Sequence, residues 1–177
     1  MSPSRPVAEI GGIAHMVYDG DSIRQRSKHR KMLPVEESIS PALKAAGFTK
    51  KSRTWWLENE DAVQVLNLQK SAAGTGLLFN LGIYVKALGT ERNPPVGRCH
   101  IQARLEGVTD QPGSALVLSA WSGQAPTDAL ASVVLRDGVT WLNNLSTLAG
   151  IRQHVLSSAS ERMLVVDAVR ELFADSV

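Results

Sequence analysis

Two apolar runs joined by a short turn that contains glycine are the feature of this sequence that most restricts its fold. They occupy residues 63–88 and read VQVLNLQKSAAGTGLLFNLGIYVKAL. Runs of apolar and β-branched residues on both sides of small turn residues are typical of a β-hairpin. The sequence therefore predicts a fold built around an antiparallel sheet.

The turn of this hairpin decides which residues face each other, because a shift of one residue moves every side chain to the opposite face. With residues 73–75 at the centre, the expected pairs are Gln69 with Phe79, Leu68 with Asn80, Leu66 with Gly82 and Gln64 with Tyr84. The face expected toward the helices carries Val63, Val65, Phe79, Leu81, Ile83 and Val85. The opposite, polar face is expected to carry Gln64, Lys70, Asn80, Tyr84 and Lys86. Asn67 and Gln69 fall on the helix side in this alignment.

A second strand with two distinct faces follows at residues 98–106, where apolar and polar side chains alternate. Its apolar side is expected to carry Cys99, Ile101, Ala103 and Leu105. Its polar side is expected to carry Arg98, His100, Gln102, Arg104 and Glu106. Strict alternation of this kind is typical of an antiparallel strand with one buried face. A further strand is expected over residues 115–121, after a turn at residues 110–113.

Residues 50–58 are expected to form an edge strand, because its lysines and arginine discourage association of edges. Trp55 and Trp56 are consecutive in this strand, so their side chains point to opposite faces. One tryptophan can enter the core. The other must be covered by the N-terminal arm, by a partner or by a ligand, and cover by the arm is the commonest of these outcomes.

Helices are expected before and after the strands along the sequence. Residues 35–46 carry an apolar stripe at helical spacing, with Pro41 beginning or kinking the helix, Gly47 ending it and Phe48 packing back on the last turn. A second helical stretch begins at Pro126, has a weak point at Gly138 and breaks near residues 143–147. A terminal helix is expected to begin at residues 158–161, which have capping-box spacing. Its buried face is expected to carry Leu164, Val165, Ala168, Val169 and Leu172. Together these elements predict an α+β fold, an antiparallel sheet of about four to five strands with helices packed on one face.

Several short segments carry a resemblance to a known family. They are AGFTKK at residues 46–51, NLQKS at 67–71, FNLGI at 79–83 and RCHIQARL at 98–105. In this order they resemble the bacterial family filed as domain of unknown function 4304, from Leu33 to Leu105 closely and over the helical remainder loosely. The resemblance implies the fold but no particular activity, substrate or cofactor.

Length and composition favour a single domain. The chain has 177 residues, of which 44% are hydrophobic, and a chain of this size buries about 70% of its unfolded surface in one core. Residues 1–22 mix Pro, Gly and Ser with scattered apolar positions, so we expect an extended or poorly ordered arm followed by one domain over residues 23–177.

Cofactors and membranes are not expected. Cys99 is the one cysteine, and the four histidines at positions 15, 29, 100 and 154 lack the close spacing of metal ligands. We expect no cofactor and no metal. No segment has the length and apolar character of a membrane span, and the first fifteen residues lack the apolar core of a signal peptide. A cytoplasmic location is therefore expected.

The one concentrated charge run, RQRSKHRK at residues 24–31, has two interpretations. It is either a solvated helix face or a patch that binds phosphate. The formal net charge is only +2, and no aromatic residues alternate with the run to stack on bases. We therefore expect no more than weak binding of nucleic acid.

Catalytic motifs are missing, and the polar sheet face is the remaining candidate site. The sequence has no nucleophile elbow, phosphate-binding loop or dinucleotide fingerprint, and Cys99 and His100 point to opposite sides of their strand. The polar face is expected to carry Asn80, Tyr84, His100, Gln102 and Arg104. It is either merely solvated or a recognition surface. A small accessory module that binds a protein is the first function hypothesis, and an enzyme that uses His100 and Arg104 on an anionic small molecule is the second. The sequence leaves the oligomeric state open.

Overall fold

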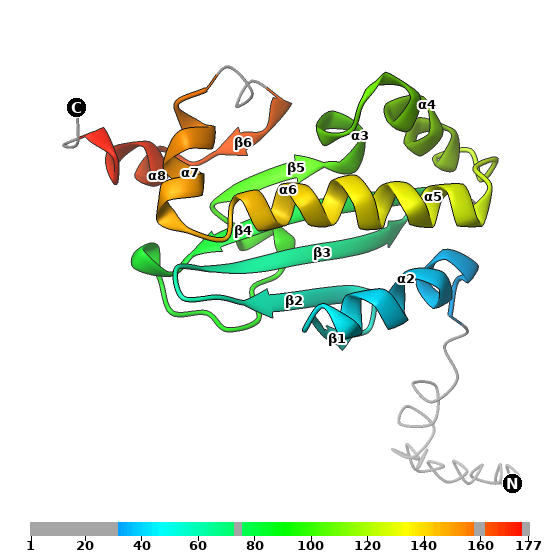
Figure 1. Cartoon of the computed structure of the whole chain (residues 1–177), viewed down its shortest axis with the longest axis horizontal. Helices are drawn as coiled ribbons and strands as arrows, with labels where there is room; N and C mark the ends of the chain where they lie inside the picture. Colours follow the sequence, from blue (N-terminus) through cyan, green and yellow to red (C-terminus); the bar gives the residue numbers. More distant parts are fainter. Residues whose placement is uncertain (1–31, 73–75, 158–161, 175–177) are drawn as a thin grey trace, which may run out of the picture. The chain divides into compact units, whose positions relative to one another are not determined.

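Six strands form one antiparallel sheet in which each strand pairs with the next along the chain (Figure 1). The computed structural model describes residues 32–72, 76–157 and 162–174. The strands are β1 (Thr49–Lys51), β2 (Thr54–Glu58), β3 (Ala62–Lys70), β4 (Leu77–Val85), β5 (Ile101–Arg104) and β6 (Leu164–Val165). The predicted α+β class is confirmed, with one strand more than the largest number expected.

The β3–β4 hairpin is present, but its predicted register was wrong by one residue. Phe79 pairs with Leu68 and not with Gln69 as expected. Asn80 pairs with Asn67 and not with Leu68. Residues paired directly across antiparallel strands share a face. Leu66, Leu68, Leu81 and Ile83 therefore share the helix side, and Val63, Val65, Asn67 and Gln69 lie on the opposite face with Asn80 and Tyr84.

Two residues expected at the margin of the polar face are corrected by the same shift. Gln64 pairs with Ile83 on the helix side and is fully buried there. Lys70 pairs with Leu77 on that side as well. Alternation could not fix the register because β3 is buried on both faces, so apolar residues occupy odd and even positions alike.

The expected edge strand over residues 50–58 is a small hairpin, β1 and β2, with Ser52 in the left-handed region at its turn (φ 59°). Trp55 enters the core and Trp56 faces the other way, as expected. Helix α2 (Pro34–Ala45) precedes this hairpin and continues through Pro41. Its Glu36 carboxylate lies 2.8 Å from the Lys50 ammonium, which ties the helix to the edge strand.

Gly47 ends helix α2 with a positive φ of 93°, as the sequence predicts. The Phe48 N–H donates to the Leu43 carbonyl at 3.0 Å, and its ring is buried in the main core. This is the backbone pattern that closes a helix on a left-handed glycine.

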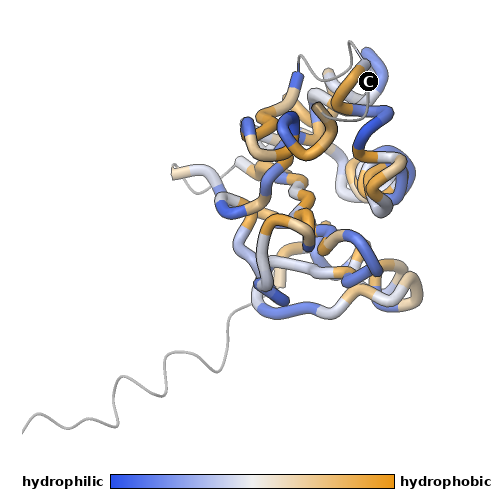
Figure 2. The backbone as a smooth tube through the Cα atoms, turned by 90° about the vertical axis from the view of Figure 1, so that its left-hand side faces the viewer, coloured by the Kyte–Doolittle hydropathy of each residue, from blue (hydrophilic) through white to orange (hydrophobic). Residues whose placement is uncertain are grey.

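A rod of helix crosses the sheet on one face (Figure 1). It consists of α5 (Thr127–Val133), a π-helical turn η4 (Val134–Gly138) and α6 (Val139–Asn144), so the predicted irregularity at Gly138 and the break after it are both present. The hydropathy colouring of Figure 2 shows apolar stretches in strands and helices alike. The main core lies between these two layers.

Residues 115–120 are helical and Trp121 is the C-cap of the helix, which corrects the fifth strand expected at 115–121. Helix α4 (Gln111–Ala120) follows the short helix α3 (Leu105–Val108). The Asp110 side chain accepts from the Gly113 N–H at 2.8 Å, and Pro112 lies in the first turn. An aspartate cap followed by proline is a helix start, and this local signal outweighs the short apolar run after it.

The predicted terminal helix was also wrong. After α7 (Leu148–Val155) the described chain resumes with strand β6, and helix α8 (Asp167–Glu171) begins only after it. The Val166 N–H donates to the His100 carbonyl at 3.0 Å, which holds this segment against β5. Val165 and Val169 are buried as expected, whereas Leu164 and Leu172 are exposed.

The face of the sheet opposite the helices is partly covered by residues 86–100, the β4–β5 connection. This connection contains the 3₁₀ turns η2 (Lys86–Leu88) and η3 (Val96–Arg98). It closes a second apolar cluster made of Val63, Val65, Tyr84 and Cys99, with Trp56 and Val96 packed against it. The Trp56 indole N–H donates to the Pro94 carbonyl at 2.9 Å. Trp56 is thus covered at least in part by the connection. The N-terminal arm, which was expected to cover it, lies outside the described residues.

Candidate functional site

Of the five residues expected on the polar face, Tyr84 lies under the β4–β5 connection and His100 is the last residue of that connection. Tyr84 is buried, and its ring centroid is 4.5 Å from that of His100. The Tyr84 hydroxyl accepts from the Glu91 N–H at 3.3 Å, and His100 Nδ1 accepts from the Val85 N–H at 3.0 Å. Burial lowers the pKa of His100, and the nearby Glu91 carboxylate opposes this shift in part. Both side chains therefore make contacts that hold the connection against the sheet.

Cys99 is a buried thiol in the same cluster, and it does not lie on the helix side where strand alternation placed it. The 3₁₀ turn before it directs its side chain toward Val63 and Val65. Burial raises the pKa of this thiol to about 12, and Glu91 adds to the effect. A thiol with so high a pKa is not a nucleophile at neutral pH, so Cys99 contributes packing.

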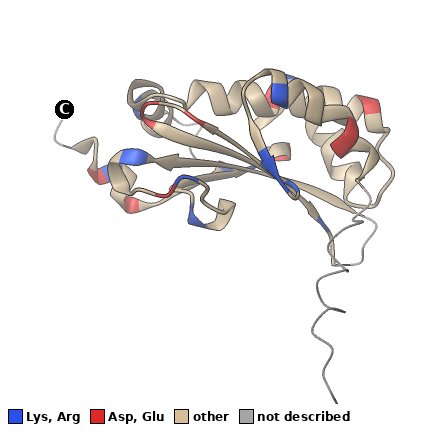
Figure 3. Ribbon diagram, turned by 90° about the horizontal axis from the view of Figure 1, so that it is seen from below, with Lys and Arg blue, Asp and Glu red and all other residues tan. Residues whose placement is uncertain are grey.

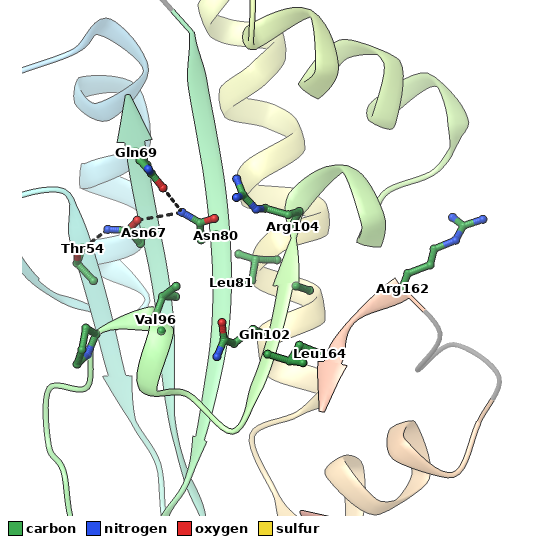
Figure 4. Close-up of a pocket in the computed structure, with 13 residues that line it drawn as sticks. Thr54, Asn67, Gln69, Asn80, Leu81, Val96, Gln102, Arg104, Arg162 and Leu164 are labelled. Atoms are coloured by element: carbon green, nitrogen blue, oxygen red, sulfur yellow. Dashed lines mark hydrogen bonds between the residues drawn. The ribbon is translucent and has the colours of Figure 1, made fainter. Parts of the chain in front are cut away.

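The part of this face that the connection leaves open forms a pocket of about 600 Å³, the sheet-face pocket (Figure 4). Volumes of this order are common for ligand sites. Strands β2 to β5 form its floor, and the connection and the residues around β6 form its walls. It is lined by Thr54, Asn67, Gln69, Asn80, Leu81, Pro95, Val96, Gly97, Gln102, Ala103, Arg104, Arg162 and Leu164.

Amide side chains on neighbouring strands form a ladder across the pocket floor (Figure 4). Asn67 Nδ2 donates to Thr54 Oγ1 at 2.8 Å and to the Arg53 carbonyl at 3.4 Å. Asn80 Nδ2 donates to Asn67 Oδ1 at 3.1 Å and to Gln69 Oε1 at 3.3 Å. The direct pairing of Asn67 with Asn80 across β3 and β4 brings these amides together.

Arg104 supplies the positive charge of the pocket. It pairs with Asn80 across β4 and β5, so the two side chains share the pocket face. Arg104 is exposed, and among the described residues its guanidinium makes no hydrogen bond or ion pair. Arg162 stands at the rim, and its side chain extends away from Arg104 in Figure 4. No Asp or Glu belongs to the described lining, so the field in the pocket favours an anion.

The structure therefore brings Asn80, Gln102 and Arg104 together in one pocket and leaves Tyr84 and His100 outside its lining. Sequence reasoning missed Asn67, Gln69 and Thr54, which the correct register places beside Asn80. The paired asparagines were visible in the sequence as a signal, since an amide on each strand of a hairpin at matching distances from the turn can form a cross-strand pair. Arg162 comes from a distant segment and left no comparable signal.

Other kinds of site find no support in the part of the chain that the structure describes. There, no group of His, Cys, Asp and Glu is arranged to hold a metal ion. Among the helices of the same residues, none has the length and apolar character needed to cross a membrane. Figure 3 shows Lys and Arg distributed among Asp and Glu in this part of the chain. The basic run at residues 24–31 lies outside the described residues.

Comparison with known proteins identifies the family. No curated protein and no solved structure gave a significant match. One family profile, described as domain of unknown function (DUF4304), matches residues 39–144. These residues include β1 to β5 and the helical rod, and they supply the whole pocket lining except Arg162 and Leu164. Because the match spans more than half of the 177 residues and carries the sheet, the pocket floor and Arg104, the chain belongs to the DUF4304 family.

Proposed function

We propose that this chain is an accessory module of the bacterial cytoplasm that binds a protein partner through the sheet-face pocket. The observation that carries the proposal is the Arg104 guanidinium, which has no hydrogen bond or ion pair among the described residues and lies beside an amide ladder, in a described lining without any carboxylate. A guanidinium forms two parallel hydrogen bonds with a carboxylate, so an acidic group on the partner is the complementary feature. The cytoplasmic location is supported by the free, buried Cys99 thiol.

The second hypothesis, an enzyme that uses His100 and Arg104, is less well supported by the geometry. His100 does not line the pocket that contains Arg104. Its Nδ1 atom already accepts a backbone hydrogen bond, and its ring packs on Tyr84. A general base must lie within hydrogen-bonding reach of the group it deprotonates. A binding role needs only Arg104 in the pocket and therefore fits this geometry better.

The test is capture of partners from a bacterial lysate by the full chain and by two arginine variants. Arg104→Ala should lose a partner that the wild-type chain retains. Arg136→Ala is the matched control, since Arg136 is exposed on the helix layer, away from the pocket lining, and forms an ion pair with its neighbour Asp137. Both variants should keep the thermal stability of the wild-type chain, because exposed positions change it little.

Arg104→Lys refines the result, since lysine keeps the charge but loses the fork-shaped contact, so intermediate retention is expected. A partner retained equally by wild type and Arg104→Ala would show that this pocket is not its site. Binding that is lost in Arg136→Ala as well would point to a general effect of charge and would contradict the proposal.

A further inference from the structure

The orientation of the amides in the pocket is set by backbone carbonyls, which can only accept hydrogen bonds. Asn67 Nδ2 faces the Arg53 carbonyl, so Asn67 Oδ1 must face β4. Asn80 therefore turns its Nδ2 toward Asn67, where it also reaches Gln69 Oε1. With both N–H groups of Asn80 in use, its Oδ1 atom is left as the free end.

Asn80 Oδ1 has no hydrogen-bond partner among the described residues and points toward the Arg104 side of the pocket (Figure 4). Asn80 itself is only 7% exposed. Its Oδ1 atom opens into the pocket, where it can accept a hydrogen bond from a ligand. The pocket thus offers an acceptor at its floor directly beside a guanidinium that favours an anion.

A second acceptor is fixed in the same way. Gln102 Nε2 donates to the Cys99 carbonyl at 2.9 Å, which leaves Gln102 Oε1 as the outer end of that amide. Gln102 pairs with Gly82, so no side chain from β4 stands between it and Asn80. Asn80 and Gln102 are diagonal neighbours on adjacent strands, and residues in that relation lie about 7 to 8 Å apart.

The separation of Asn80 and Gln102 is close to the repeat of the N–H groups along an extended peptide. N–H groups on one edge of an extended chain recur at every second residue, about 6.6 to 6.8 Å apart. One such N–H can pair with Asn80 Oδ1 and the next with Gln102 Oε1. Arg104 pairs directly with Asn80 across β4 and β5. The anion that Arg104 binds must therefore belong to the peptide residue whose N–H group donates to Asn80.

We propose that the sheet-face pocket binds the C-terminus of an extended peptide, with its free carboxylate on Arg104 and its last N–H groups on Asn80 and Gln102. The inference rests on the proposed function and specifies the acidic group of the partner. A free phosphate has no N–H group to place against either amide oxygen. A nucleotide would need a stacking surface, and the described lining contains no aromatic side chain.

The test uses short peptides of mixed sequence, anchored to a resin by their N-termini, in two matched libraries. One library ends in a free carboxylate and the other in a carboxamide. The full chain should be retained on the carboxylate library at least about tenfold more strongly, as expected for loss of a charged hydrogen-bonded pair. Arg104→Ala should abolish this preference, and Arg136→Ala should preserve it.

The outcomes separate this inference from the proposed function. Equal retention on both libraries, with bound peptides enriched in internal Asp or Glu and retention dependent on Arg104, would overturn the C-terminal assignment and leave the proposed function standing. Retention on neither library, or retention that ignores Arg104→Ala, would overturn both. A preference for immobilised nucleotides over both libraries would also overturn the peptide assignment.

Discussion

Gln64 is the amide on the helix side of the sheet that lacks a complete set of partners. It is 1% exposed, and its Oε1 atom has no hydrogen-bond partner within the described chain. An unpaired buried oxygen costs about 1 to 3 kcal/mol. Gln64→Met keeps the volume and removes the polar atom, so we expect the free energy of unfolding in denaturant to rise by about 1 kcal/mol.

Gln153→Met is the control for this substitution, because Gln153 is exposed on helix α7. Its free energy of unfolding should stay within about 0.5 kcal/mol of the wild-type value. A loss of stability in Gln64→Met would show that this amide is paired in solution, through water or otherwise.

His100 makes the fold sensitive to acid. Burial lowers its pKa from the ordinary value of 6.5, so the folded chain holds this proton less tightly than the unfolded chain. The contribution of neutral His100 to the free energy of unfolding is therefore fully present above about pH 6.5. It is lost as the pH falls from there through the lower pKa that His100 has in the folded chain. Protonation of Nδ1 would also break its bond from the Val85 N–H.

His100→Asn should flatten this pH dependence, since an asparagine oxygen can accept from Val85 but takes up no proton in this range. The measurement is the free energy of unfolding as a function of pH. Some slope should remain, because burial also lowers the pKa of His154. An unchanged slope would show that protonation of His100 is not coupled to folding.

Among the elements, the β4–β5 connection depends on a glycine beneath it. A Cβ atom on Gly82 would lie 2.6 Å from Cys99 Sγ, closer than such atoms approach, and 3.1 Å from a Val96 methyl carbon, which is an unusually tight contact. Gly82→Ala should therefore lower the free energy of unfolding by about 1 to 3 kcal/mol through overpacking. Cys99→Ala in the same chain should restore part of the loss, because it removes the nearest atom.

The measurement is a double-mutant cycle on these two positions. Additive effects of Gly82→Ala and Cys99→Ala would contradict the close seating of the connection on β4. Gly97→Ala is the control, since a Cβ atom there meets nothing within 4 Å.

The elements also show where sequence reasoning succeeds. Helix α2, its Gly47 stop and the buried Phe48 follow from local signals, and so do the break after α6 and the opposite faces of Trp55 and Trp56. The pairing of β3 with β4 depends instead on which face of β3 is covered, and both are. The helix at residues 111–120 was missed because an apolar run of seven residues fits a strand or a helix, and the Asp110 cap decided between them.

The candidate site was predictable only in part for the same reason. Asn80, Gln102 and Arg104 share a face through simple alternation, and the structure places them together. Tyr84 is also on that face, but the fifteen residues between β4 and β5, which end at His100, fold back over it. No periodic pattern encodes where such a connection lies. The placement of Asn67 and Gln69 depends on the register of β3 and β4, which the position of the turn near residues 73–75 did not determine.

At the scale of the whole molecule, the sheet should open from its edges. β3 and β4 pair along nine residues each and carry core side chains, whereas β1 has three exposed residues and β6 has two residues. Native-state hydrogen exchange should therefore be slowest for amides of β3 and β4 and fastest, within the sheet, for those of β1 and β6. Uniform protection across all six strands would contradict this order and indicate a single opening unit.

The β4–β5 connection has a consequence for how such a protein can diversify. It is at once a wall of the pocket and the cover of the second apolar cluster, yet it joins two strands that are already neighbours. Its length sets how much of the sheet is open. A shorter connection would widen the binding floor and strip Trp56 of its cover, and a longer one would close the floor over Arg104. Specificity could thus change by insertion and deletion in one surface loop, without any substitution in the strands that carry the amides.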